Sequence, residues 1–265
     1  MILNINQLKK DLIKIKKEKP MIYHLTNYVA MPECANITCA IGASPIMSLD
    51  YNEVKEVISE AKALVVNIGT LTQSLIPTIL LALTWAEKTK VPVLFDPVGA
   101  GATRFRTEFA LEIIKRKVEV IKGNQGEISS LLGKKGAVKG VDSKIKLGAK
   151  LVKRFSNQVK SIVVATGEKD YISDGRKIYV IENGTEMFQK ITAAGCMLGS
   201  VVASFLAVQK KPLIAVIEGL ACYNISGEIS AEKCKGVGSF KQIFFDEIFN
   251  ISPKKIIERI KIKEF

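Results

Sequence analysis

The chain has 265 residues, of which 48% are hydrophobic and 25% are charged, with 19 Gly and 8 Pro. This composition is that of an ordinary globular protein, and it excludes disordered, collagen-like and disulfide-stapled chains. The longest apolar run, residues 196–208, is shorter than the roughly 18–20 residues of a membrane helix. The N-terminal lysines alternate with apolar residues, which is not the pattern of a signal peptide. We therefore expect a cytoplasmic protein without membrane attachment, in which residues 1–265 form a single domain.

The formal net charge of +13 raises the question of nucleic-acid binding. The two densest basic stretches, residues 9–19 and 254–263, alternate with Ile and Leu as amphipathic surface elements do. Aromatic residues make up only 7% of the chain and do not interleave with basic runs into stacking platforms. We therefore expect no nucleic-acid partner. The positive charge of the chain would also attract an anionic small substrate such as a nucleotide.

The chain has five cysteines and a single histidine, His24. An odd number of cysteines without an export signal indicates reduced thiols. We expect Cys34, Cys39, Cys222 and Cys234 to be small core residues. The single histidine excludes a His-rich metal site, and it restricts any Cys-His or Ser-His dyad to His24 itself.

Short apolar, β-branched runs alternate with helical stretches along the chain. The runs predict strands at residues 63–68, 93–96, 118–122 and 162–166, and the stretches between them predict helices at 75–88, 107–115, 127–132 and 143–155. Residues 171–182 predict a hairpin around Asp174-Gly175. Further helices are expected at residues 196–208, 213–231 and 241–249. The alternation predicts an α/β protein with a parallel sheet and right-handed crossovers.

In such a sheet, ligands bind beyond the carboxyl ends of the strands. The strand at residues 93–96 ends in Asp96, and a glycine-rich loop over residues 97–103 follows it. A carboxylate and a small loop that admits close backbone approach suit a magnesium-phosphate site. A structural turn with an Asp cap would have the same sequence.

The next strand ends at a predicted helix start that contains Asn124 and Glu127. Their spacing lets both side chains face one cavity, where Glu127 would add a second carboxylate near the metal. A capping box is the structural alternative. After the strand at residues 162–166, Thr166 and Gly167 could line a nucleotide pocket, although a turn into the hairpin would look the same.

Small residues at 192–195 lead directly into a long helix with Cys196 in its first turn. Free amides at a helix start bind anions, and the helix dipole adds positive potential. The same field is expected to lower the pKa of the cysteine. The segment therefore offers an anion hole and a base, with a buried structural cysteine as the alternative.

Several segments, in this order, resemble the ribokinase-like fold and, more narrowly, the hydroxyethylthiazole kinase family of thiamine salvage. The segment DPVGAGATRFRTE at residues 96–108 is highly specific for that family. The other segments that carry the resemblance are His24–Val29, Gly42–Met47, Asn124–Glu127, Thr192–Cys196 and Gly236–Phe240. The resemblance implies a three-layer α/β/α fold with a mostly parallel central sheet.

The resemblance also implies transfer of the ATP γ-phosphoryl group to the hydroxyl of 4-methyl-5-(2-hydroxyethyl)thiazole, with Mg²⁺. It implies a homotrimer whose active sites lie at subunit interfaces. By position, the substrate residues would be Asn27, Met47, Ala193 and Gly195, and the ATP residues would be Lys122, Asn124, Thr166 and Gly167. Asp96 and Glu127 would organise the metal, and Cys196 would be the catalytic base.

The chain departs from the family pattern at three positions. Ala193 replaces the first glycine of the signature Thr-Gly-x-Gly-Cys, Lys122 stands where the family has arginine, and Val237 replaces a proline. A methyl group restricts the backbone at 193, and lysine lacks the bidentate fork of arginine. Ala193 and Lys122 suggest one alternative, a catalytically inactive nucleotide-binding regulator. A second alternative keeps the fold and changes the substrate: a ribokinase-like kinase of another small alcohol, such as a hydroxymethylpyrimidine, pyridoxal or a sugar.

Overall fold

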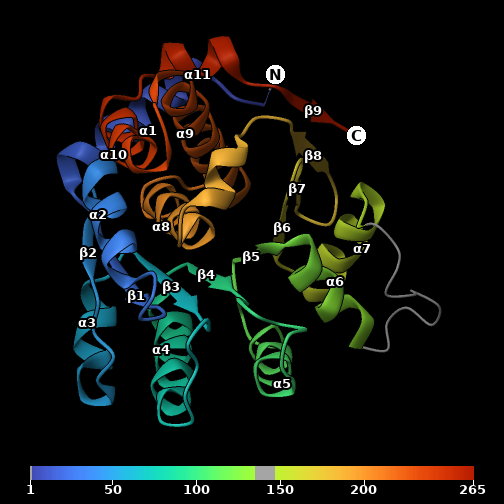
Figure 1. Ribbon diagram of the computed structural model, residues 1–265. Coiled ribbons are helices and arrows are strands. Elements are labelled where there is room, and N and C mark those ends of the chain that lie inside the picture. Colours follow the sequence, from blue (N-terminus) through green and yellow to red (C-terminus); the bar gives the residue numbers. More distant parts are fainter. Residues whose placement is uncertain (1, 135–146) are drawn as a thin grey trace.

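The computed structural model describes residues 2–134 and 147–265. Its centre is a nine-stranded sheet with the order β2-β1-β3-β4-β5-β6-β7-β8-β9 (Figure 1). The strands from β2 to β6 pair in parallel, and they are β2 (Ser44–Ile46), β1 (Met21–Leu25), β3 (Ala63–Asn67), β4 (Val93–Asp96), β5 (Val120–Asn124) and β6 (Ile162–Thr166). The antiparallel strands that complete the sheet are β7 (Asp170–Ser173), β8 (Ile178–Ile181) and β9 (Ile262–Glu264).

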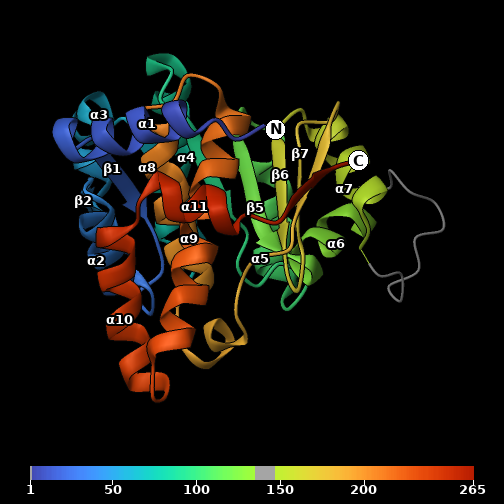
Figure 2. The ribbon, with the colours of Figure 1, turned by 90° about the horizontal axis from the view of Figure 1, so that it is seen from above.

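Helices cover both faces of this sheet, as Figures 1 and 2 show. The helices on one face are α1 (Ile5–Glu18), α2 (Met31–Ile41), α8 (Ala194–Leu206), α9 (Pro212–Lys233), α10 (Val237–Asn250) and α11 (Pro253–Arg259). Those on the other face are α3 (Val54–Glu60), α4 (Leu75–Thr89), α5 (Arg104–Ile113), α6 (Gln125–Lys134) and α7 (Ala149–Val159). The expected three-layer α/β/α architecture is confirmed.

Alternate residues of each strand face different helical layers, because successive side chains of a strand point to opposite faces. In β4, Leu94 packs in the core beneath α8, whereas Val93 and Phe95 pack in the core beneath α4 and α5. All four residues of β4 are buried. A continuous apolar run in the sequence therefore corresponds to a strand covered on both sides.

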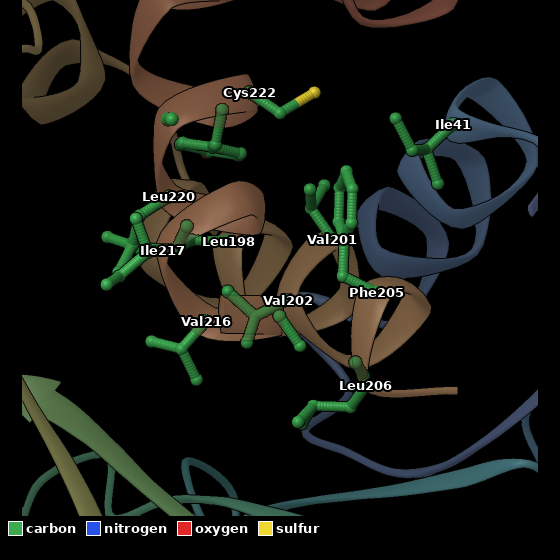
Figure 3. Close-up of a cluster of buried hydrophobic side chains, with 14 of the residues drawn as sticks. Ile41, Leu198, Val201, Val202, Phe205, Leu206, Val216, Ile217, Leu220 and Cys222 are labelled. Atoms are coloured by element: carbon green, nitrogen blue, oxygen red, sulfur yellow. The ribbon is translucent and has the colours of Figure 1, made fainter. Parts of the chain in front are cut away.

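Helices α8 and α9 form the centre of one layer, where Val202, Leu206, Val216 and Leu220 belong to the same buried cluster (Figure 3). Gly219 allows the close approach of these helices, since a Cβ atom there would lie 2.8 Å from the Cα atom of Val202. By length and composition α9 could cross a membrane, so residues 196–208 are not the longest apolar candidate. Of its most apolar window, 83% is buried inside the fold, as in the core helix of a soluble protein.

The predicted strands at residues 93–96 and 162–166 match β4 and β6, and the predicted hairpin corresponds to β7 and β8. The strand predicted at residues 118–122 lies two residues further along, as β5. Residues 143–146 of the helix predicted at 143–155 lie outside the described residues, and α7 begins at Ala149.

The expectation of four core cysteines is half wrong. Cys34 and Cys222 are buried, but Cys39 is exposed and Cys234 is half-buried. The exposed thiol lies on the outer side of α2, whose buried residues include Cys34, Ile37 and Ile41. The helical periodicity of α2 turns residue 39 away from the core.

Candidate active site

The site lies at the carboxyl edge of the parallel strands, where the ends of β1, β3, β4 and β5 meet the first turn of α8. The sheet register aligns Asn67 with Asp96, the last residues of β3 and β4, so their side chains emerge side by side. The hydrogen bonds around these two residues connect Asn27, Lys122, Gly195 and Cys196. Residues that lie far apart in the sequence therefore converge at one edge, as expected for an open parallel sheet.

A buried ion pair occupies the centre of this edge. The Nζ atom of Lys122 lies 2.8 Å from Oδ2 of Asp96, and the two side chains are 4% and 1% exposed. The same ammonium donates a hydrogen bond of 2.8 Å to the carbonyl oxygen of Gly195. Lys122 thus fixes the first turn of α8 against the end of β4.

Asp96 keeps one carboxylate oxygen unpartnered. Its Oδ1 atom is buried and accepts no hydrogen bond within the described parts of the chain. Burial raises the pKa of Asp96 to about 6, although Lys122 opposes the shift and Glu127 adds to it. The free oxygen and the raised pKa mark a carboxylate whose charge a further cation would stabilise.

Asn67 is a site residue that the sequence analysis did not single out. Its Nδ2 atom donates to Oδ2 of Asp96 at 3.1 Å and contacts Sγ of Cys196 at 3.2 Å. Its Oδ1 atom accepts from Nδ2 of Asn27 at 2.8 Å. The signal was available, because Asn67 is a polar residue that ends an apolar strand, just as Asp96 is.

Cys196 lies in the first turn of α8, half-buried, with Asn27 and Asn67 against its sulfur. Burial and the Asp96 carboxylate raise the pKa of this thiol, and Lys122 only partly offsets them. The expectation of a lowered pKa is therefore wrong, because desolvation and a neighbouring carboxylate disfavour the thiolate. In the free protein Cys196 is a thiol.

Glu127 forms a capping box at the start of α6. Its Oε2 atom accepts from the Asn124 amide at 2.8 Å, and the Glu127 amide donates to Oδ1 of Asn124 at 2.9 Å. Its Oε1 atom accepts from the Gly99 amide at 3.0 Å, which ties the glycine-rich loop to α6. Gly99 has a φ of +81°, a conformation that favours glycine. The carboxylate is thus held in place beside Asp96, whose pKa it raises.

A cavity of about 280 Å³ opens next to this cluster. Asn124, Thr166 and Gly167 line it together with Gly195, so three of the expected ATP residues and one expected substrate residue share one cavity. The residues that complete its wall include Asp170, Asn183, Phe188, Tyr223 and Asn224. Lys122 lies in the buried ion pair instead, and Met47 follows the edge strand β2 and is half-buried.

The backbone at Ala193 is strained. Its φ of 68° and ψ of 7° lie in the left-handed region, and it is the N-cap of α8. The other described non-glycine residues with positive φ are helix C-caps, Lys19, Lys90 and Lys160, where this conformation is common. No side chain caps the first amides of α8, so they remain available to an anion.

Comparison with known proteins decides which family these features belong to. The model of the hydroxyethylthiazole kinase family matches residues 12–254. A hydroxyethylthiazole kinase from Archaeoglobus fulgidus is 54% identical over 257 residues, which cover 97% of this chain and 96% of that protein. The chain belongs to the hydroxyethylthiazole kinase family.

Two solved structures place this family member in its fold class. The hydroxyethylthiazole kinase of Pyrococcus horikoshii has a TM-score of 0.90 and 36% identity, with 98% of this chain and 99% of that chain covered. A ribokinase-like superfamily protein from Enterococcus faecalis has a TM-score of 0.65 at 12% identity, with 95% and 96% covered. The expected ribokinase-like fold of this hydroxyethylthiazole kinase family member is thereby confirmed.

His24 is buried in the interior of this member of the family. Its ring nitrogens lie 2.9 Å from the Ile22 carbonyl oxygen and 3.0 Å from Oγ of Ser200, and the side chain is fully buried. Burial lowers the pKa of His24 to about 4. The ring is therefore neutral at physiological pH and acts in packing.

The acidic residues of the site fit a magnesium ion that is shared with phosphates. Within residues 2–134 and 147–265, no three His, Cys, Asp or Glu side chains form a cluster that could hold a metal alone. Mg²⁺ prefers one or two carboxylates, with water and substrate phosphates completing its shell. The unpartnered Oδ1 of Asp96 supplies an oxygen donor of the required kind.

Proposed function

We propose that this chain transfers the γ-phosphoryl group of ATP to the primary hydroxyl of 4-methyl-5-(2-hydroxyethyl)thiazole. The observation that carries the proposal is the chain of contacts from Asp96 through Asn67 to Cys196 at the open start of α8. These contacts join a carboxylate that has one unpartnered oxygen to a thiol in the first turn of α8, whose first amides have no side-chain cap. Phosphoryl transfer depends mainly on such positioning and on charge neutralisation.

Asp96 and Glu127 are the residues that would hold Mg²⁺, which, when bound, neutralises charge on the ATP phosphates. Asp96 would contribute its free oxygen, and Glu127, whose oxygens already accept two amide hydrogen bonds, would act through its remaining lone pairs or a water molecule. The first-turn amides of α8 would bind the equatorial oxygens of the transferred group.

Cys196 would accept the proton of the substrate hydroxyl late in the transfer. Its pKa is raised partly by the Asp96 carboxylate, so neutralisation of that charge would move the thiol toward the thiolate. Asn27 and Asn67 contact the sulfur and would orient it toward the hydroxyl. A base of this kind contributes typically about 10²–10⁴-fold to the rate.

The other residues would bind the two substrates on either side of the transferred group. Asn27, Met47, Ala193 and Gly195 would contact the thiazole alcohol. ATP would occupy the cavity lined by Asn124, Thr166 and Gly167, with the charge of Lys122 nearby. The Lys122 ammonium donates to the Gly195 carbonyl in the first turn of α8, so a positive charge lies next to the uncapped amides of that helix. This positive end supports the placement of the ATP phosphates there.

We also propose a cytoplasmic homotrimer of this single domain, with each active site completed by a neighbouring subunit. Tyr28 and Val29 support the proposal, because they follow Asn27 directly and are 64% and 61% exposed. Exposed apolar side chains beside a substrate residue favour coverage by another subunit. Sedimentation equilibrium of the purified protein should give three times the mass of the 29.1 kDa chain.

The proposal is tested by measuring ADP release with a panel of alcohols. The thiazole alcohol should stimulate ADP release far more than hydroxymethylpyrimidine, pyridoxal or a sugar. Preference for one of those alcohols would favour the alternative kinase. ATP binding without ADP release from any alcohol would favour the inactive regulator.

A further inference from the structure

Asp170 and Asn224 form a buried pair in the wall of the cavity. Asp170 begins β7 and Asn224 lies in α9, and both are 5% exposed. Oδ2 of Asp170 accepts a hydrogen bond of 2.7 Å from Nδ2 of Asn224. Oδ1 accepts one of 3.1 Å from the amide of Gly167. The pair therefore joins the turn between β6 and β7 to helix α9.

A carboxylate at this position is expensive to bury, because burial disfavours its charged form. Burial raises the pKa of Asp170 to about 6, against the opposing effects of Asn224, the Gly167 amide and the Lys122 charge. No ion pair in the described parts of the chain involves Asp170. Its charge is therefore balanced chiefly by two hydrogen-bond donors, both of which also lie in the cavity wall.

The hydrogen bond from the Gly167 amide to Asp170 orients the whole peptide group between Thr166 and Gly167. Because a peptide group is planar and trans, an amide N–H that points at Asp170 sets the direction of the Thr166 carbonyl on the opposite side. Thr166 and Gly167 both line the cavity. Asn224 in turn prevents the carboxylate from rotating, since it holds the other oxygen.

We propose that Asp170 and Asn224 are positioning residues for the nucleotide, which set the Thr166–Gly167 peptide in the orientation that binds ATP. This inference rests on the proposed function, in which the cavity takes ATP. It assigns the pair an effect on ATP affinity and none on the affinity for the thiazole alcohol, since three of the alcohol's proposed contacts, Asn27, Met47 and Ala193, are not among the residues that line this cavity.

The test is calorimetric titration of the full chain with ATP and Mg²⁺, together with the KM of each substrate. Asp170→Ala removes the acceptors of both the Asn224 side chain and the Gly167 amide. The loss of these buried hydrogen bonds should weaken ATP binding by about 10-fold or more. The KM of the thiazole alcohol should change less than about twofold.

The exchanged pair Asp170→Asn with Asn224→Asp restores an acceptor for Gly167 and a donor for the new carboxylate. It should return the Kd for ATP to within about threefold of the parent value. The matched control is Asp174→Ala, the same substitution just after the other end of β7, where Oδ1 accepts from two exposed turn amides. This control should leave ATP affinity unchanged.

Several outcomes would overturn the inference. If Asp170→Ala binds ATP as tightly as the parent, or if the exchanged pair binds no more tightly than Asp170→Ala, the pair does not position the nucleotide. Should Asp170→Ala fail to fold, Asn224→Ala is measured instead, and it should weaken ATP binding by about 10-fold. A parent chain that does not bind ATP would overturn the proposed function and this inference together, whereas equal binding by the variants overturns this inference alone.

Discussion

The ammonium of Lys122 lies 2.8 Å from a carboxylate oxygen of Asp96, and both side chains are almost completely buried. The pair leaves the second oxygen of Asp96 without a hydrogen bond from any residue that the structure describes. Asp96 is therefore bound to Lys122 through one carboxylate oxygen and available to a cation through the other. Removal of either partner would leave the other charge buried and uncompensated, which is strongly destabilising.

The Asp96→Asn variant should lose turnover sharply, by about 100-fold or more, because the free carboxylate oxygen and its charge are lost together. Extra Mg²⁺ should repair the loss only in part. Steady-state kinetics over a range of Mg²⁺ concentrations measures both effects. If the variant loses thermal stability and keeps its turnover, Asp96 has only a structural role.

The activity of the parent protein should fall as the pH drops through about 6. Burial raises the pKa of Asp96 to about 6, so below this pH the carboxyl is neutral and binds a cation poorly. Because Mg²⁺ and the proton compete for the same oxygen, higher Mg²⁺ should move this acid limb to lower pH. Asp170 also has a pKa of about 6, but it is not a proposed metal ligand, so only the limb that belongs to Asp96 should move with Mg²⁺. His24, with a pKa of about 4, cannot produce the limb. An acid limb that does not respond to Mg²⁺ would contradict this assignment.

Replacement of Cys196 tests whether its thiol is the catalytic base. Cys196→Ala should lower kcat by about 10²-fold or more, since no other acceptor replaces the sulfur. Cys196→Asp should keep activity, because a carboxylate at the same helix start can accept the proton. If Cys196→Ala retains turnover within about threefold of the parent, the base assignment is wrong.

Ala193→Gly should raise the free energy of unfolding by about 1 kcal/mol, because it removes a methyl group from a left-handed backbone position. The matched control is Ala194→Gly, the same change at the next residue. Since Ala194 is helical, this control should lower stability by up to about 1 kcal/mol. Denaturant titration measures both variants, and a less stable Ala193→Gly would show that the loop is unstrained.

The free energy of unfolding should decrease as the pH rises, because Glu218 has a higher pKa in the folded chain than in the unfolded chain. Burial and the nearby Asp11 carboxylate raise the pKa of this α9 side chain from 4.5 to about 9. Between these values the folded chain holds a proton that the unfolded chain has lost, so stability falls with pH by at most about 1.4 kcal/mol per unit. Glu218→Gln should remove this slope in denaturant titrations at pH 7 to 8.5, which lies above the pKa of about 6 of Asp96 and Asp170. Exposed Glu87→Gln is the control and should keep the slope, and an unchanged slope in Glu218→Gln would contradict the prediction.

The sequence was most informative where local pattern and burial coincide. The positions of β4 and β6 follow from four consecutive buried residues in each strand, and Asp174-Gly175 locates the hairpin turn. Strand β9 could not be predicted, because its three residues depend on pairing with β8, about 80 residues earlier.

The site residues also divide into those that local sequence predicts and those that depend on contacts between distant segments. Asp96, Glu127 and Cys196 follow from their places at strand ends and a helix start, and the structure brings them together. The raised pKa of Cys196 could not be predicted, since it depends on burial and on the Asp96 charge rather than on its own helix. The Asp170–Asn224 pair joins residues 54 positions apart, so it too required the packed structure.

The most direct test of the account is the transfer of a labelled γ-phosphoryl group from ATP to the thiazole alcohol, followed by chromatography of the products. The parent chain should place the label on the hydroxyl of the alcohol, and Asp96→Asn should place almost none there. Label found only in inorganic phosphate, or equal labelling of the alcohol by Asp96→Asn, would contradict phosphoryl transfer at the edge where Asp96 and Cys196 meet.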